Sequence, residues 1–205
     1  MADRFDLTVL LDLLGTFAFA ISGIRLASRK NFDWFGAYVI GLATAVGGGT
    51  LRELLLDLPP VWLTDPRYLI VTGIALLFTI VFKVPMARWA NTLFLFDAIG
   101  LGLFTVTGIT RSLSMDLPVW TCIIMGTITG SVGGVIRDVL INEVPLIFRK
   151  DLYATACIFG GIAYFIGLQF PALDPFHELI AALTVIIVRI LAVKFHLGLP
   201  KLERS

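Results

Sequence analysis

Charged residues are scarce in this chain, because Asp, Glu, Lys and Arg together make up only 15% of its 205 residues. Soluble proteins average about 25% charged residues, so the low charge argues against a soluble domain. Hydrophobic residues make up 58% of the chain, and its mean hydropathy is +0.92. These values predict a membrane protein with several spans. The formal net charge of +1 offers no basic surface, so we expect no nucleic-acid partner.

Cysteine and histidine are also scarce, with two residues of each type. Cys122 and Cys157 lie in apolar runs, so we expect small buried side chains and no disulfide. His177 and His196 do not have the spacing of metal ligands, and we expect no tightly bound metal. The sequence contains no recognisable nucleophile–base pair, metal cluster or nucleotide-binding loop. We therefore expect neither an enzyme nor a cofactor.

Seven apolar runs are long enough, or nearly so, to cross a membrane as helices of roughly 20 residues. Short polar connections that contain proline separate several of them and leave no room for a soluble domain. The chain is therefore predicted to be an all-α integral membrane protein, with one transmembrane domain over residues 1–205. The expected spans are residues 5–26, 35–56, 68–82, 92–113, 119–141, 152–170 and 177–195.

Lysine and arginine are distributed unevenly over the loops, and cytoplasmic loops are normally richer in them. This bias predicts an outer N-terminus and a cytoplasmic C-terminus, and the short C-terminal tail fits a bacterial inner (plasma) membrane protein. With that orientation, the outer segments hold three cationic residues, Arg4, Arg67 and Arg111. The inner loops and the C-terminus hold ten: Arg25, Arg29, Lys30, Lys83, Arg88, Arg149, Lys150, Lys194, Lys201 and Arg204.

The chain matches itself without a gap when it is shifted by 85 residues. The segment "LLDLLGTFAFAISGI" (residues 10–24) lies on "LFDAIGLGLFTVTGI" (residues 95–109), which pairs Asp12 with Asp97. Each copy holds three spans, and an odd number turns the second copy upside down in the membrane. We therefore expect two inverted repeats, over residues 5–82 and 90–170, followed by a seventh helix at 177–195. Further pairs at the same offset include Gly48 with Gly133, Gly49 with Gly134, Arg52 with Arg137, Glu53 with Asp138, and Tyr68 with Tyr153.

Three consecutive glycines, Gly47, Gly48 and Gly49, lie within the second span. A glycine inside a helix costs about 1 kcal/mol relative to alanine, so we expect a kink or a short unwound stretch. Gly133 and Gly134 predict the same in the fifth span. Backbone groups freed in this way require a hydrated interior. The alternative is that the glycines let helices pack closely, and both interpretations can hold.

Ionisable residues at membrane depth are costly and often functional. At about 1.5 Å per residue, Asp12 and Arg52 both lie roughly 7–10 Å below the outer surface, so they can meet. By the inverted symmetry, Asp97 and Arg137 meet on the inner side. These pairs predict one charged gate per face, or alternatively ion pairs that only lock the helices together. Glu53 and Asp138 are additional acidic partners of the two arginines.

Hydroxyl groups accompany the glycines. Thr44 and Thr129 precede them by about one turn, and Ser131 is closer still. With carbonyls freed by a kink, these hydroxyls would suit a small cation or a zwitterion. Ser22 and Thr107, at matching places in the first and fourth spans, are secondary candidates. Arg189 in the seventh span is expected near the inner interface, where snorkelling or an intersubunit contact would explain it as well as a function.

The motifs "GGGTLRE" and "VGGVIRD", placed equivalently in a six-span inverted repeat with a seventh span, resemble the prokaryotic trimeric intracellular cation (TRIC) channel family. The resemblance covers residues 5–195. It implies a homotrimer with one pore per protomer, permeable to K⁺ and Na⁺ and flanked by bends at the glycines. Glu53 stands where the bacterial pattern more often has aspartate, and the lysine motif of animal members is absent.

Two functions follow from these residues. Small residues, hydroxyls and acidic side chains in duplicate favour a monovalent cation channel for K⁺ and also Na⁺. Inverted repeats with broken helices also suit a secondary transporter of a small zwitterion such as glycine, and bacterial members of the same domain family have been described as glycine transporters.

Overall fold

The computed structural model describes residues 2–82, 92–149, 152–173 and 176–199, with side chains from residue 7 onward. Five cationic residues used to predict the orientation, Lys83, Arg88, Lys150, Lys201 and Arg204, therefore lie outside the described residues. The described part contains seven α-helices and three 3₁₀ helices: α1 (Ala2–Arg29), α2 (Trp34–Leu55), η1 (Val61–Leu63), α3 (Arg67–Val81), α5 (Thr92–Leu113), α6 (Val119–Leu140), η2 (Leu146–Phe148), α7 (Ala154–Gly167), η3 (Pro171–Leu173) and α8 (His177–Lys194).

Four of these helices, α1, α2, α5 and α6, are long and apolar enough to cross a membrane. The other two repeat helices are shorter, with 15 residues in α3 and 14 in α7. At about 1.5 Å per residue they span roughly 20 Å, which is less than the ~30 Å hydrocarbon core. The predicted sixth span at 152–170 was too long, because a hydrogen-bonded turn over residues 168–170 follows the end of α7 at Gly167.

The backbone repeats itself where the helices end. Left-handed residues follow α1 and α5 at Asn31 and Asp116, with φ of 59° and 55°. They also follow α2 and α6 at Asp57 and Asn142, with φ of 57° and 58°. Asn and Asp tolerate this conformation better than most residues, and the two members of each pair lie 85 positions apart. The repeated sequence therefore ends its helices with the same backbone geometry.

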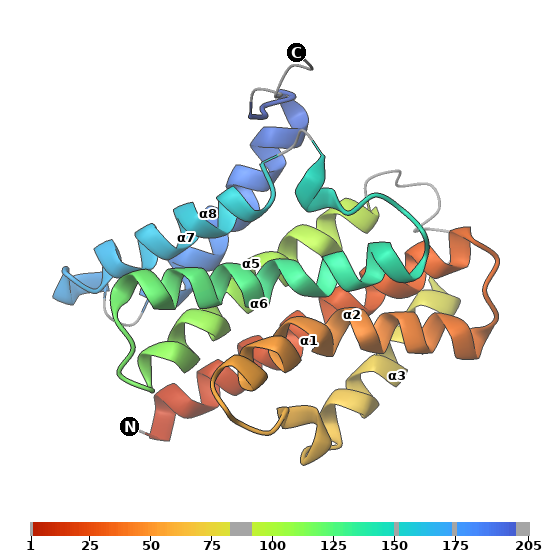
Figure 1. Ribbon diagram of the computed structural model, residues 1–205, viewed down its shortest axis with the longest axis horizontal. Coiled ribbons are helices and arrows are strands. Elements are labelled where there is room, and N and C mark those ends of the chain that lie inside the picture. Colours follow the sequence, from red (N-terminus) through yellow and green to blue (C-terminus); the bar gives the residue numbers. More distant parts are fainter. Residues whose placement is uncertain (1, 83–91, 150–151, 174–175, 200–205) are drawn as a thin grey trace.

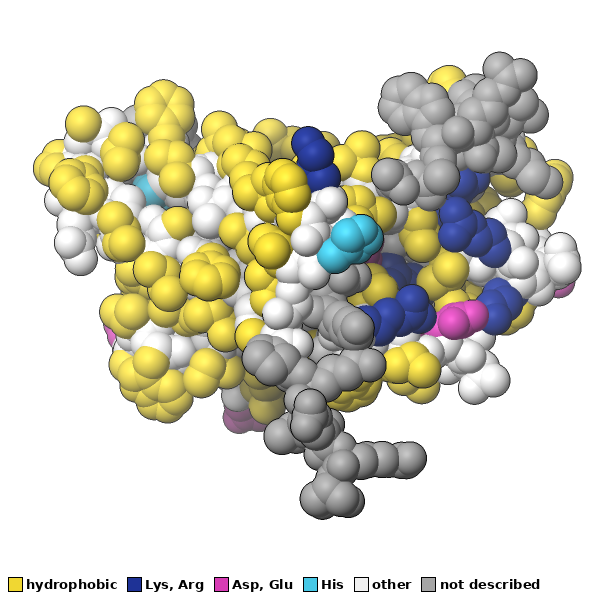
Figure 2. Space-filling view, turned by 90° about the horizontal axis from the view of Figure 1, so that it is seen from above, with side chains coloured by type: hydrophobic (Ala, Val, Ile, Leu, Met, Phe, Trp, Pro, Cys, Tyr) yellow, Lys and Arg dark blue, Asp and Glu magenta, His cyan; other side chains and the backbone are white. Residues whose placement is uncertain are grey.

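Helices α1, α2, α5 and α6 lie side by side and form the core of the molecule (Figure 1). The equivalent helices α1 and α5 run in opposite directions, as do α2 and α6 (Figure 1). Helix α3 packs on α1 and α2, and its equivalent α7 packs on α5 and α6. Helix α8 packs on α5 and α7. This is the predicted inverted repeat with one helix, α8, outside it. Seen from above, hydrophobic side chains cover much of the surface, and Lys and Arg gather toward the end where α1 and α6 finish (Figure 2).

The glycines lie where α2 and α6 cross. A Cβ atom at Gly48 would lie under 3.0 Å from the carbonyl oxygen of Thr129, and one at Gly133 would also lie under 3.0 Å from the carbonyl oxygen of Thr44. Both helices remain continuous through their glycines, and no described glycine has a positive φ. The expected unwound stretch was therefore wrong. Each glycine removes the side chain that would keep two backbones apart, and the helical hydrogen bonds remain intact.

Candidate functional site

A first cluster of polar side chains comprises Asp12, Arg52, Glu53, Thr107 and Arg111. Arg52 donates to Oε1 of Glu53 from Nε at 2.9 Å and from Nη2 at 2.7 Å. Arg111 approaches the other oxygen of Glu53 at 3.4 Å. Glu53 is fully buried, whereas the Arg111 side chain is 39% exposed. Two arginines therefore share one buried carboxylate.

Asp12 has a different partner from the one that we expected. The hydroxyl of Tyr68, from α3, donates a hydrogen bond to Oδ2 of Asp12. Arg52 lines the same cavity as Asp12, but its described ion pair joins it to Glu53. The predicted direct pair of Asp12 with Arg52 was therefore wrong. Glu53 accepts two hydrogen bonds from the guanidinium of Arg52, and the carboxylate of Asp12 accepts one from the hydroxyl of Tyr68.

The first cluster lines a cavity of about 350 Å³. Its walls include Val9 from α1 and Thr110 from α5, together with all members of the cluster. A smaller space is also lined by Asp12 and Arg52, together with the ring of Phe104. The cluster is therefore accessible from its own end of the bundle.

A second cluster comprises Ser22, Asp97, Arg137 and Asp138. Nη1 of Arg137 lies 2.5 Å from Oδ1 of Asp97 and 2.5 Å from the hydroxyl oxygen of Ser22. Nε and Nη2 of Arg137 both lie 2.8 Å from Oδ1 of Asp138. The expected contact of Asp97 with Arg137 is present, and each side chain is only 1% exposed. The second cluster is closed, in contrast to the first.

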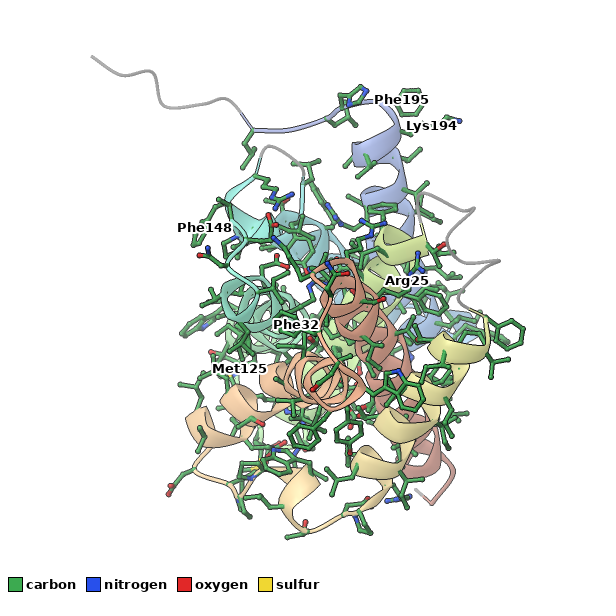
Figure 3. The ribbon with its side chains drawn as sticks, turned by 90° about the vertical axis from the view of Figure 1, so that its right-hand side faces the viewer. Arg25, Phe32, Met125, Phe148, Lys194 and Phe195 are labelled. Atoms are coloured by element: carbon green, nitrogen blue, oxygen red, sulfur yellow. The ribbon has the colours of Figure 1, made fainter. Side chains whose placement is uncertain are left out.

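The two clusters lie at opposite ends of the core. Arg52 and Arg137 are in the last turns of α2 and α6, and these helices run in opposite directions (Figure 1). Viewed from the second-cluster end, α1, α2 and α6 surround a centre filled by side chains (Figure 3). Ser22 from α1 and Thr107 from α5 each join the cluster of the other repeat. The sequence had ranked these two hydroxyls as secondary candidates.

Two phenylalanines occupy the middle of the core between the clusters. The rings of Phe19 and Phe104, which are equivalent positions, have centroids 5.3 Å apart. Both side chains are buried, and Gly100 leaves the room that the Phe19 ring fills. These rings therefore fill part of the core between the two clusters.

The threonines near the glycines do not form an open binding site in this structure. Thr44 and Thr129 are fully buried and donate to the carbonyls of Ile40 and Met125 in their own helices. Their hydroxyl oxygens fill the notches left by Gly23 and Gly108, where a Cβ atom would lie under 3.0 Å away. The carbonyls are still in helical hydrogen bonds, so the expectation of freed carbonyls was wrong. Ser131 likewise donates to its own helix, at the carbonyl of Thr127.

We expect Tyr68→Phe to lower the stability of the folded protein by about 1.5–3 kcal/mol, because the hydroxyl donates to a carboxylate. Thermal unfolding of the purified protein in detergent measures this change. The matched variant is Tyr153→Phe at the equivalent position, where the hydroxyl has no partner among the described residues. It should lower stability by less, and equal effects would contradict the assignment.

The repeat is also visible in comparisons with known proteins. A family model described as "Glycine transporter" matches residues 9–84 and again residues 94–169. The chain is 39% identical over 193 residues to the UPF0126 inner membrane protein YadS of Escherichia coli K12, which covers 93% of each chain. It is 40% identical to a UPF0126 membrane protein of Vibrio cholerae, over 95% of this chain and 82% of the relative.

Among solved structures, the TRIC channel orthologue from Rhodobacter sphaeroides superposes with a TM-score of 0.86 and 34% identity, over 93% of this chain and 99% of that one. A second TRIC cation channel structure gives a TM-score of 0.83 and 38% identity, over 96% and 97% of the two chains. The chain belongs to the TRIC family. The seven α-helices of its described residues superpose on these TRIC structures, and the prediction of fold class is confirmed. The TRIC neighbours are channels and not enzymes, as we expected for this chain.

Proposed function

We propose that the protein is a monovalent cation channel that conducts K⁺ and also Na⁺ through the core of each protomer. The observation that carries this proposal is the pair of charged clusters at opposite ends of α1, α2, α5 and α6. The TRIC cation channels that the chain resembles support the same function. K⁺ or Na⁺ is then the permeant ion, and the function needs no cofactor or tightly bound metal.

In this proposal the ion enters by the cavity of the first cluster, passes Phe19 and Phe104, and leaves through the second cluster. Asp12 supports this route, because an acidic side chain raises the local concentration of cations. The closed second cluster would be the gate, since Arg137 places a cation across the path. The crossing of α2 with α6 at Gly48 and Gly133 would serve as the pivot between the two ends.

We further propose a homotrimer in a bacterial inner membrane, with the first cluster outside and the second facing the cytoplasm. The Rhodobacter relative is a trimeric intracellular cation channel orthologue, and the E. coli relative is named an inner membrane protein. Exposed cationic residues at the second-cluster end support the orientation by the positive-inside rule; they are Arg29, Lys30 and Arg149.

The second candidate function is transport of a small zwitterion such as glycine. One cluster is open to a cavity while the other is closed, as alternating access requires of a transporter. The carboxylate of Asp12 and the guanidinium of Arg52 line the same cavity and could hold the amino and carboxyl groups of a zwitterion. The description of the family model points the same way.

Flux measurements on proteoliposomes separate the two candidates. We expect K⁺ efflux that does not saturate with concentration, and no concentrative uptake of labelled glycine. Empty liposomes serve as the control for leakage. Saturable glycine uptake with no K⁺ flux would reject the channel and assign the cavity of the first cluster to glycine.

A further inference from the structure

The two clusters differ at one pair of equivalent tyrosines. Tyr68 donates to Asp12 in the first repeat. Its equivalent, Tyr153, is buried, and its hydroxyl has no partner among the described residues. Oδ2 of Asp97 is also buried without a described partner. Both side chains lie within 4 Å of the place that a Cβ atom would occupy at Gly134. The Asp97 atom near Gly134 is Oδ1, which accepts from Arg137. The Tyr153 hydroxyl therefore lies near the Asp97 carboxylate without a hydrogen bond to either of its oxygens.

Arg189 of α8 lies against the ring of Tyr153. Its guanidinium carbon lies 4.7 Å from the centroid of the Tyr153 ring and 5.2 Å from that of Phe94. Nη1 donates to the carbonyl of Leu152 at 3.1 Å, and Arg189 is only 1% exposed. A desolvated guanidinium over an aromatic face is held by cation–π attraction. Because α8 lies outside the repeat, Tyr68 has no equivalent of Arg189.

We infer that Arg189 is a positioning residue that holds Tyr153 away from Asp97 and so keeps the second cluster closed. This inference rests on the proposed gate. With Tyr153 held, the described bonds of Asp97 run to Arg137 alone. Without Arg189, the Tyr153 hydroxyl can turn to Oδ2 of Asp97, as Tyr68 does to Asp12. Asp97 then divides its charge between two donors and binds Arg137 less tightly. The cluster that already has the tyrosine–aspartate bond is the one that is open.

Labelling of Cys157 tests this role without requiring any ion flux. Cys157 is a buried free thiol one turn after Tyr153 on α7. In a Cys122→Ala background we expect Arg189→Met to speed the reaction of Cys157 with N-ethylmaleimide by about tenfold. This is the rate expected if the variant raises the equilibrium population of the opened second cluster by about a factor of ten. Adding Tyr153→Phe to Arg189→Met should return the rate to within about twofold of the parent, since only the hydroxyl can stabilise the opened arrangement.

A purely structural clamp between α7 and α8 predicts a different result. Arg189→Met would then speed labelling equally with tyrosine or phenylalanine at position 153, and that outcome overturns the inference, as does an unchanged rate in Arg189→Met. If Arg189→Met does not fold, Arg189→Lys gives the same comparison, because lysine cannot reach both rings and the Leu152 carbonyl together. Lack of K⁺ flux in the parent protein would instead reject the proposed channel and leave the labelling result valid.

Discussion

Gly48→Ala is expected to destabilise the protein severely, whereas Gly49→Ala, one residue later, is expected to be tolerated. A methyl group at Gly48 would lie under 3.0 Å from the backbone oxygen of Thr129, which cannot move without shifting α6. Overpacking of this kind costs about 1–3 kcal/mol, and occasionally more. At Gly49 the nearest atom is Nη2 of Arg52 at 3.8 Å, an ordinary contact, and alanine should gain up to about 1 kcal/mol in helix propensity.

Thermal unfolding in detergent compares these variants directly. The midpoint should fall in Gly48→Ala and stay level or rise in Gly49→Ala. Gly133→Ala, the equivalent of Gly48→Ala, should behave like it, and Gly73→Ala should be harmless because nothing lies within 4 Å of its added methyl group. Equal effects at Gly48 and Gly49 would show that the crossing of α2 with α6 is not the reason for the triplet.

Arg137→Gln is expected to lower stability and raise K⁺ flux together. Arg137 is only 1% exposed and contacts Asp97 and Asp138. Removing one partner of a buried ion pair costs about 3–5 kcal/mol, because the remaining charge is left uncompensated. The same change removes the cation that we place across the path, so the flux per folded protein should increase. Thermal unfolding and proteoliposome efflux measure the two effects on one preparation.

The matched control is Arg149→Gln at the same end of the molecule. Arg149 is 46% exposed and lies 3.6 Å from Glu143. Exposed ion pairs contribute roughly 0–1 kcal/mol, so this variant should keep both the stability and the flux of the parent. If Arg137→Gln retained parental flux, the second cluster would be a structural lock and not a gate.

The sequence predicted the fold well because charged residues and glycines match each other 85 positions apart, which reveals the repeat. Asp12 and Asp97, or Arg52 and Arg137, cannot align by chance together with the glycine pairs. The positions of the helices and their inverted order follow from that alignment and from the length of the apolar runs. The contact of Asp97 with Arg137 also follows, because both residues were expected at one depth.

Contacts between helices were harder to predict. Depth alone suggested that Arg52 would bind Asp12, whereas Glu53 and Tyr68 take those places. Tyr68 and Tyr153 are visible as a matching pair in the sequence, and this signal could have placed them beside the two aspartates. The sequence left two interpretations of the glycines open, an unwound stretch and close helix packing, and the backbone contacts of Gly48 and Gly133 agree with the second. Which backbones they approach depends on how α2 and α6 cross, and no local pattern contains that information.

The most direct test of the account is covalent block of single K⁺ channels. Val9 lines the cavity of the first cluster, and Val9→Cys can be made with Cys122 and Cys157 replaced by alanine. A cationic methanethiosulfonate added on the first-cluster side should remove the K⁺ current of one proposed trimer in three equal steps, one for each proposed pore. Met115→Cys, 43% exposed on the loop after α5, should be modified without loss of current. K⁺ currents that persist through full modification at position 9, or the absence of unitary K⁺ currents, would contradict a path through the core of each protomer.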